Sequence, residues 1–154
     1  MVANAGTANT GAVDNLRQTA EIAKNYNLWF HVDAAYGGFF LLTKQGQTLM
    51  KGIEGADSLV LDPHKSLFLP YGTGVLLVRD KTKLLSAFNF TGTYLPPQEQ
   101  KATDPLLDDI MYLSPEVSRD FRGFRIWLPL KMLGMKPFRE QLEEKLKLTR
   151  WVTK

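Results

Sequence analysis

The chain of 154 residues contains no cysteine. Disulfide cross-links, thiolate metal ligands and a cysteine nucleophile are therefore excluded. Long apolar runs are missing too, because stretches such as 126–130 fall far short of the roughly 20 residues that cross a bilayer as a helix. The residues after Met1 lack the basic and apolar pattern of a secretory leader. We therefore expect a cytoplasmic protein with no membrane partner.

A strong excess of one charge is also absent. Lys and Arg total 19 against 16 Asp and Glu, which gives a formal net charge of only +3. The densest basic cluster, Arg119, Arg122 and Arg125, alternates with aromatic residues at helical spacing, as is typical of an amphipathic helix. We therefore expect no nucleic-acid partner. The composition, 44% hydrophobic and 23% charged, is that of a soluble globular protein.

Three short apolar runs predict β-strands, at 28–32, 58–61 and 74–78. Their continuous apolar character is typical of parallel strands that are buried on both faces. Before the first run, Asp14 is a candidate N-cap for a helix that places Leu16, Ala20 and Ala23 on one face. This order predicts an α/β fold with a mostly parallel sheet flanked by helices.

The second half of the chain predicts further helices. A short helical segment is expected at 84–88, and a longer helix from Ser118 that is kinked at Pro129 and stopped at Gly134. Pro137 can open a last helix. The inner face of the longer helix is predicted to carry Phe121, Phe124, Leu128 and Met132, and that of the last helix Phe138, Leu142 and Leu146.

Two chemically capable residues follow neighbouring predicted strands. Asp33 comes directly after the run 28–32, and Lys65 follows the run 58–61. Open α/β sheets bind ligands beyond the carboxyl ends of their strands. A carboxylate at the end of a buried strand needs a cationic partner. We expect the Lys65 amine, which is flanked by apolar runs, to be drawn into a partly apolar site where it becomes nucleophilic. Together they can hold pyridoxal phosphate, with Asp33 at the pyridinium nitrogen and Lys65 bonded to the aldehyde as a Schiff base.

Simpler interpretations of these residues stay open. Asp33 can be a helix N-cap or a salt-bridge partner, and Lys65 can be a surface lysine whose stem covers apolar surface. Ala34 and Ala35 favour the cofactor, because two small side chains in succession leave room for a flat ring, and Gly37 and Gly38 are expected to keep the approach open. His64 can contact a ligand or merely satisfy a backbone carbonyl, whereas His31 is expected to be a core residue.

A metal site is not expected. The two histidines, His31 and His64, lie in different predicted strands or turns. Together with Asp33 and Asp62 they match no compact spacing of metal ligands.

Three motifs taken together resemble the group II pyridoxal-phosphate-dependent amino-acid decarboxylases, a family that includes the aromatic-amino-acid, histidine and glutamate decarboxylases. The motifs lie at 2–7, 31–38 and 57–65. The resemblance implies the large domain of a type I, aminotransferase-like fold, of which 1–154 would be an incomplete, central part. Within it, 1–90 would be the sheet-and-helix core, 91–117 a mobile-loop region and 118–154 a helical region.

The resemblance also implies roles for individual residues. Lys65 would form the Schiff base, Asp33 would pair with the pyridinium nitrogen, and Tyr94 would deliver the proton that replaces carbon dioxide. The implied catalytic residues are Lys65, His64 and Tyr94, and the implied cofactor-binding residues are Lys65, Asp33, Ala35 against the ring, His64 near the phosphate, and Thr7. Tyr94 can also be an ordinary exposed loop tyrosine.

The implied activity is removal of the α-carboxylate of an L-amino acid to give an amine and carbon dioxide. The family's active site lies at a homodimer interface, and the isolated chain is expected to be inactive. Two alternatives remain: another type I pyridoxal-phosphate enzyme, or a truncated product that binds no cofactor. The chain departs from the family pattern at Asp62, where many members carry asparagine, and at Ser66, where tryptophan is frequent. No cofactor contact is assigned to Asp62.

Overall fold

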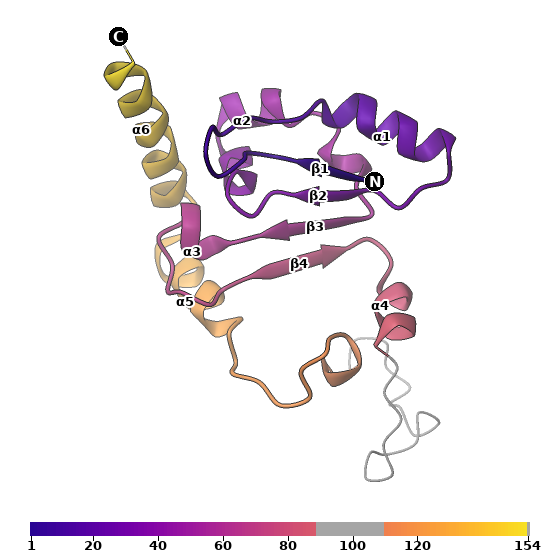
Figure 1. Ribbon diagram of the computed structural model, residues 1–154. Helices are drawn as coiled ribbons and strands as arrows, with labels where there is room; N and C mark the ends of the chain where they lie inside the picture. The colour runs from indigo at the N-terminus through magenta and orange to yellow at the C-terminus, as the bar shows by residue number, and fades with distance from the viewer. Residues whose placement is uncertain (89–109, 154) are drawn as a thin grey trace. The chain divides into compact units, whose positions relative to one another are not determined.

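A computed structural model describes residues 1–88 and 110–153 (Figure 1). The chain divides into two compact units: Met1–Leu77 with Phe121–Lys154, and Val78–Asp120. The predicted mobile-loop region, 91–117, falls largely outside the described residues. No helix in the described parts of the chain is long and apolar enough to cross a membrane.

A four-stranded sheet has the order β1-β2-β3-β4. Strands β1 and β2, and β2 and β3, pair in parallel, and Asp33 lies opposite Asn4 on one side and Val60 on the other. Figure 1 shows β4 running in the opposite direction to β3. The predicted mostly parallel α/β sheet is therefore confirmed. The strands are β1 (Val2–Asn4), β2 (His31–Asp33), β3 (Ser58–Leu61) and β4 (Val75–Val78).

Strand β3 has the predicted bounds, but β2 is shorter than the predicted 28–32 and includes Asp33. The first residues of that run make other hydrogen bonds. Leu28 donates its backbone N–H to the Ala23 carbonyl at 2.8 Å, and Phe30 donates its own to the Asp57 carboxylate at 2.7 Å. These donors are therefore not available for a strand ladder.

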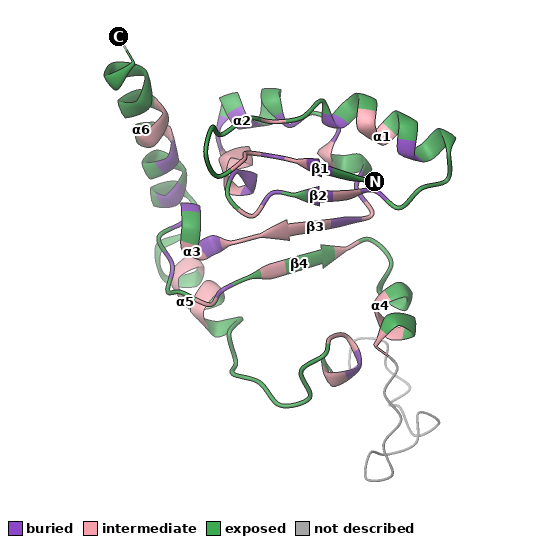
Figure 2. Ribbon diagram, in the orientation of Figure 1, coloured by how far each residue is buried: buried purple, intermediate pink, exposed green. Residues whose placement is uncertain are grey.

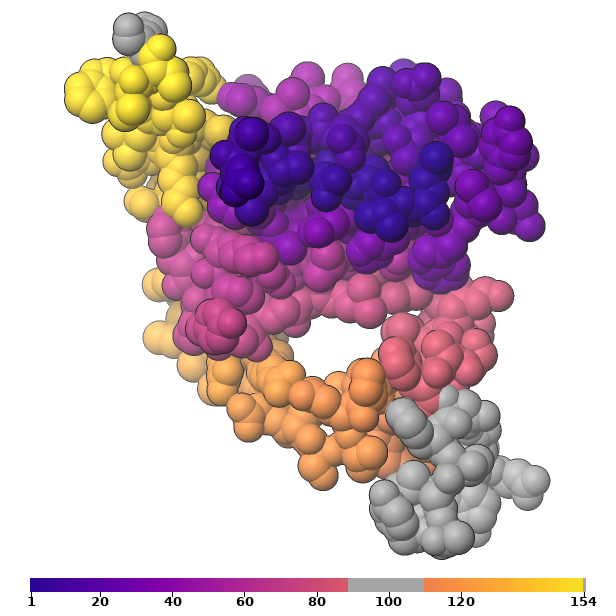
Figure 3. Space-filling view, in the orientation of Figure 1, coloured from indigo at the N-terminus to yellow at the C-terminus, as the bar shows by residue number. Residues whose placement is uncertain are grey.

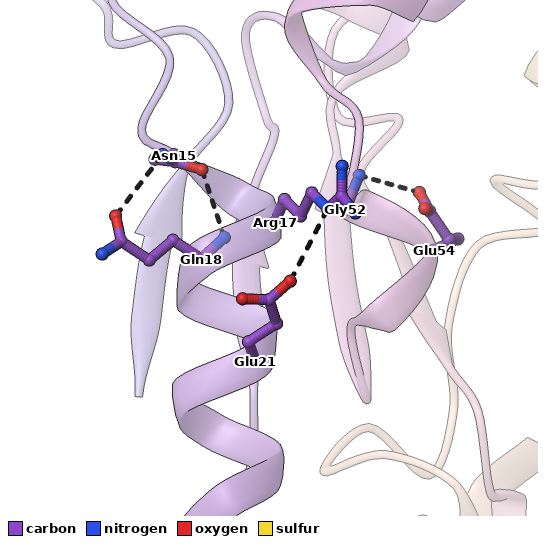
Figure 4. A network of polar contacts seen from close by, with 6 residues as sticks. All are labelled: Asn15, Arg17, Gln18, Glu21, Gly52 and Glu54. Carbon is purple, nitrogen blue, oxygen red and sulfur yellow. Dashed lines mark hydrogen bonds and ion pairs between the residues drawn. The ribbon is translucent and has the colours of Figure 1, made fainter.

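Helix α1 (Leu16–Asn25) begins one residue later than predicted. Its N-cap is Asn15, whose side chain accepts the backbone N–H of Gln18 at 3.1 Å, as Figure 4 shows. The carboxylate of Asp14 instead accepts the backbone N–H of Asn4 at 2.7 Å. The prediction of Asp14 as the cap is wrong because this carboxylate ties the loop to β1.

Three short helical segments lie where no helix was predicted: η1 (Gly38–Leu42), α2 (Lys44–Leu49) and η2 (Ile53–Gly55). Thr43 joins the first two, since its hydroxyl donates to the Phe40 carbonyl at 2.7 Å and accepts the N–H of Gly46 at 3.1 Å. Such local capping supports helices too short to show a clear apolar period.

The remaining helices among the described residues are α3 (Pro63–Ser66), α4 (Lys81–Ala87), η5 (Ile110–Tyr112), α5 (Phe124–Leu133) and α6 (Lys136–Val152). Helix α4 begins earlier than the predicted 84 because Asp80 caps it. The Asp80 carboxylate accepts hydrogen bonds from the hydroxyl and the backbone N–H of Thr82, and these bonds lower the pKa of Asp80.

Helix α5 begins at Phe124 rather than at the predicted Ser118. It contains Pro129 and stops at Gly134, which has a φ of 70°, as predicted. Its predicted inner face is wrong, because Phe121 is 80% exposed and Met132 is 73% exposed. Ile126 and Leu130 pack inward instead. In α6, Phe138 and Leu142 are buried as predicted, and Figure 2 shows exposed residues toward the end of this helix.

The core of the first unit has two clusters. One surrounds β1 and β2 and consists of Ala3, Ala5, Leu16, Ala23, Phe30, Val32, Ala34, Met50 and Ala56. The other joins the residues after α3 to α6 and consists of Leu67, Leu69, Phe138 and Leu142. Figure 3 shows the yellow surface of α6 adjoining the purple and magenta surface of the first 77 residues. The helix thus packs on the segment that follows Lys65.

Burial of every strand on both faces was predicted, and this is wrong for β4. Val32 in β2 is fully buried, but Leu76 and Leu77 in β4 are 52% and 51% exposed. An apolar run indicates that a strand can be buried. It does not show whether other segments cover both faces of that strand.

Candidate functional site

Asp33 and Lys65 lie beyond the carboxyl ends of adjacent parallel strands. Asp33 is the last residue of β2, and Lys65 lies in α3, the short helix that follows β3. Because β2 and β3 are parallel and paired, their carboxyl ends meet at one edge of the sheet. The topology therefore brings the two predicted residues to the same sheet edge.

Backbone hydrogen bonds hold the two segments together beyond the strands. Ala34 donates its N–H to the Val60 carbonyl at 3.2 Å, and Asp62 donates its own to the Ala35 carbonyl at 3.1 Å. On the other side, Ala5 donates to the Asp33 carbonyl at 2.7 Å. The residues around Asp33 and those that lead to Lys65 therefore keep a fixed relation.

Asp33 is exposed, so the prediction of a buried carboxylate is wrong. Its Oδ1 accepts the backbone N–H of Ala35 at 3.1 Å in a local turn, so Asp33 does not cap a described helix either. No cation among residues 1–88 and 110–153 forms an ion pair with Asp33. One oxygen is engaged in the turn, and the other is available to a ligand.

Small residues follow Asp33, but Gly37 and Gly38 serve packing rather than access. A Cβ on Gly37 would lie 2.1 Å from the Ala5 carbonyl oxygen, and one on Gly38 would lie 2.1 Å from Leu61 Cδ2. Both glycines are buried, so the prediction that they keep the approach to a ring open is wrong. Ala35 is half-buried, and its small side chain is compatible with a flat ring nearby.

Lys65 is held in an ion pair. Its Nζ lies 2.7 Å from Asp62 Oδ2, and the two side chains are 42% and 17% exposed. The prediction that the amine is drawn into apolar surroundings is therefore wrong. Asp62 precedes Lys65 by three residues at the first turn of α3, which places both side chains on one side of the turn.

His64 is half-buried beside the same pair. Its Nε2 lies 4.0 Å from Asp62 Oδ2, and its ring meets that of Tyr71 edge-on, with centroids 5.0 Å apart. Its Nδ1 is buried and has no hydrogen-bond partner in the described structure. His64 therefore does not satisfy a backbone carbonyl there, and it keeps one nitrogen for a ligand.

His31 is partly buried and is not part of the core, but its contacts join neighbouring strands. Its Nδ1 lies 2.7 Å from the hydroxyl oxygen of Ser58, which also accepts the indole N–H of Trp29 at 2.8 Å. These contacts join the start of β2 to the start of β3, at the opposite end of the strands from Asp33.

Thr7 lies in the loop after β1. Its hydroxyl lies 2.8 Å from that of Thr10 and accepts the backbone N–H of Ala12 at 3.1 Å. These bonds close the loop, and the contact of Thr7 with a cofactor stays a prediction. Tyr94 lies outside the described residues.

A cavity of about 410 Å³ lies in the first unit, but it is not lined by Asp33 or Lys65. Its walls include Thr10, Tyr36 and Leu146. The candidate site is thus an open sheet edge rather than this cavity. Among the described residues, no group of three or more His, Asp or Glu side chains is placed to hold a metal ion.

The residues at the sheet edge fit pyridoxal phosphate by their chemistry. Asp33 offers a carboxylate oxygen that can accept a pyridinium N–H, and Lys65 offers a primary amine for the aldehyde. The buried Nδ1 of His64 lacks a partner that a bound polar group can supply.

Sequence reasoning missed the part played by Asp62. The spacing of three residues between Asp62 and Lys65, with Pro63 at the first helical position, is a signal that could have predicted their contact.

Known proteins resemble this chain in sequence and in structure. Residues 1–154 match the family described as pyridoxal-dependent decarboxylase conserved domain. The chain is 36% identical over 152 residues to an aromatic-L-amino-acid decarboxylase of Bacillus atrophaeus, covering 99% of this chain and 31% of that protein. The structure is similar to that of mouse CSAD, with a TM-score of 0.86, 31% identity, and coverage of 99% of this chain and 31% of that chain.

A second solved structure, Oryza sativa TDC with PLP and tryptamine, has a TM-score of 0.81 and 29% identity. The match covers 90% of this chain and 28% of that chain. The chain thus spans less than a third of each of these three proteins. Because the match to this family covers the whole of this chain, the chain belongs to the pyridoxal-dependent decarboxylases.

Proposed function

We propose that the chain carries the cofactor-binding edge of a pyridoxal-phosphate-dependent carboxy-lyase. This enzyme removes the α-carboxylate of an L-amino acid and gives an amine and carbon dioxide. The observation that carries the proposal is the placement of Asp33 and Lys65 beyond two adjacent parallel strands, in a member of a pyridoxal-dependent family.

Pyridoxal phosphate, when bound, supplies a pyridinium ring that accepts the electron pair released as the carboxylate leaves. In our proposal the Asp33 carboxylate keeps the proton on the ring nitrogen. Lys65 supplies the amine for covalent attachment, and His64 lies near the phosphate. Ala35 and Thr7 line the site in this proposal. Ala35 lies next to Asp33, to which it donates the turn hydrogen bond.

We extend the proposal to Tyr94, which lies outside the described residues. Its phenol hydroxyl is a suitable proton donor, and in our proposal it gives the proton that replaces carbon dioxide at the α-carbon. The location and the assembly are proposals of the same kind: a cytoplasmic homodimer whose active site lies between subunits. The isolated chain is proposed to bind cofactor without turning over substrate.

A titration with pyridoxal phosphate tests the proposal. We expect a visible absorbance band when the purified chain forms a Schiff base, and loss of this band in Lys65→Ala. Lys136→Ala is the matched control, because Lys136 is 83% exposed and pairs only loosely with Glu140 at 3.8 Å. This variant should titrate like the parent chain. A band of equal strength in Lys65→Ala, or no band in the parent chain, would refute the proposal.

A further inference from the structure

Asp62 stands at the N-cap position of α3 but does not cap this helix. Three other helices have a polar N-cap residue whose side chain accepts a backbone N–H: Asn15 for α1, Thr43 for α2 and Asp80 for α4. Aspartate is among the best N-cap residues. The Asp62 carboxylate therefore does not make the N-cap hydrogen bond that its position and its chemistry favour.

The carboxylate is directed to Lys65 instead. Asp62 Oδ2 lies 2.7 Å from Lys65 Nζ and 4.0 Å from His64 Nε2. The Asp62 side chain is only 17% exposed, so water and salt screen this pair less than a fully exposed one. The backbone N–H of Asp62 is bonded to the Ala35 carbonyl at 3.1 Å, which fixes the carboxylate relative to the residues after Asp33.

The ion pair bears on the reactivity of Lys65. An ammonium group has no lone pair and cannot attack a carbonyl carbon, so the lysine must first lose a proton. The Asp62 carboxylate engages the Lys65 Nζ at 2.7 Å, and this ion pair must open before the nitrogen can bond to an aldehyde. Asn at this position, which is neutral, would not form this ion pair.

We propose that Asp62 is a positioning residue that holds the Lys65 amine in place through their ion pair whenever Lys65 is not bonded to an aldehyde. The inference rests on the proposed function, in which Lys65 forms the covalent bond to the cofactor. In the covalent step the ammonium gives up a proton and its nitrogen forms a bond to the carbonyl carbon. The carbonyl oxygen then leaves as water with that proton and a second proton from the nitrogen, and the third proton stays on the protonated Schiff base.

Reductive methylation of the whole chain with formaldehyde and cyanoborohydride tests the proposal. Mass spectrometry of peptides gives the methylation rate of Lys65 relative to that of Lys136, whose exposed pair with Glu140 is unrelated to Asp62. We expect Asp62→Asn to raise this ratio by about threefold or more, because the ammonium loses its charge partner. Asp62→Glu, which retains the charge, should bring the ratio back toward that of the parent chain.

Lys145 serves as a local control for folding. Its Nζ lies 3.4 Å from the Ser66 carbonyl and 3.8 Å from the centroid of the Phe68 ring, so its methylation reports on the packing next to Lys65. A rise confined to Lys65 supports the proposal. An unchanged ratio, a joint rise at Lys65 and Lys145, or a raised ratio that persists in Asp62→Glu would overturn it.

This experiment is independent of cofactor binding, because formaldehyde is the only aldehyde present. If the chain binds no pyridoxal phosphate, the proposed function fails while the methylation result still stands. If the methylation of Lys65 ignores Asp62, the further inference fails while the titration with pyridoxal phosphate can still succeed.

Discussion

At the scale of single residues, Asp33 has one carboxylate oxygen that no described residue occupies. Its Oδ1 accepts the Ala35 N–H, and the side chain is exposed at the end of β2. A hydrogen bond between charged groups contributes about 1.5–3 kcal/mol. A pyridinium N–H at Asp33 would therefore add measurably to the affinity for the cofactor.

We predict that Asp33→Asn weakens binding of pyridoxal phosphate by about tenfold or more, because the neutral amide cannot balance a pyridinium charge. The covalent adduct at Lys65 should still form at high cofactor concentration. The measurement is the dissociation constant from the visible absorbance titration.

Glu21→Gln is the control for the loss of one carboxylate. Glu21 lies on α1 and makes an exposed pair with Arg17 at 3.6 Å, drawn in Figure 4, and its neutralisation should leave the affinity unchanged. Equal affinities of Asp33→Asn and the parent chain would contradict the assignment of Asp33.

The sequence predicted the places of Asp33 and Lys65 because strand ends are visible as the limits of apolar runs. It did not predict the environment of Lys65. The spacing of three residues between Asp62 and Lys65 is compatible with a contact, and the structure shows that the two side chains are paired at 2.7 Å. The cofactor contact of Thr7 stays a prediction.

At the scale of elements, α6 supports the segment that carries Lys65. Leu142 of α6 is fully buried and shares a cluster with Leu67, two residues after Lys65. Next to it, Phe68 has a φ of 58°, and Lys145 lies over its ring. Burial of Lys145 lowers its pKa. A residue with positive φ needs support from its surroundings, and α6 provides it here.

We predict that Leu142→Ala lowers the free energy of unfolding by about 2–5 kcal/mol, since it removes a buried side chain from a packed cluster. Leu148→Ala on the same helix should change it by less than about 0.5 kcal/mol, because Leu148 is 54% exposed. Urea unfolding measures both. Similar losses in the two variants would show that α6 does not pack on the Lys65 segment as described.

The last helix, with its long apolar period, could be predicted, whereas the short helical segments η1, α2 and η2 could not. The inner residues of α6 repeat regularly, so Phe138 and Leu142 were identified correctly. The start of α1 was placed at Asp14 rather than Asn15, because both residues are good caps and only their contacts distinguish them. The inner face of α5 was wrong because aromatic residues such as Phe121 are apolar whether or not they are covered.

At the scale of the whole molecule, the chain has the fold of its family over less than a third of the length of the relatives compared above. The described part contains a charge partner for a pyridinium ring, an amine for an aldehyde, and a helix that supports the amine's segment. We propose that substrate turnover requires more protein than this chain contains. For the chain itself, we propose selective attachment of the cofactor at Lys65.

The most direct test maps the attachment site of pyridoxal phosphate after borohydride reduction. Peptide mass spectrometry gives the share of reduced adduct on each of the twelve lysines of the chain. At cofactor concentrations near that of the protein, we predict that the adduct is concentrated on Lys65. An adduct spread over exposed lysines such as Lys136, with no preference for Lys65, would contradict the account.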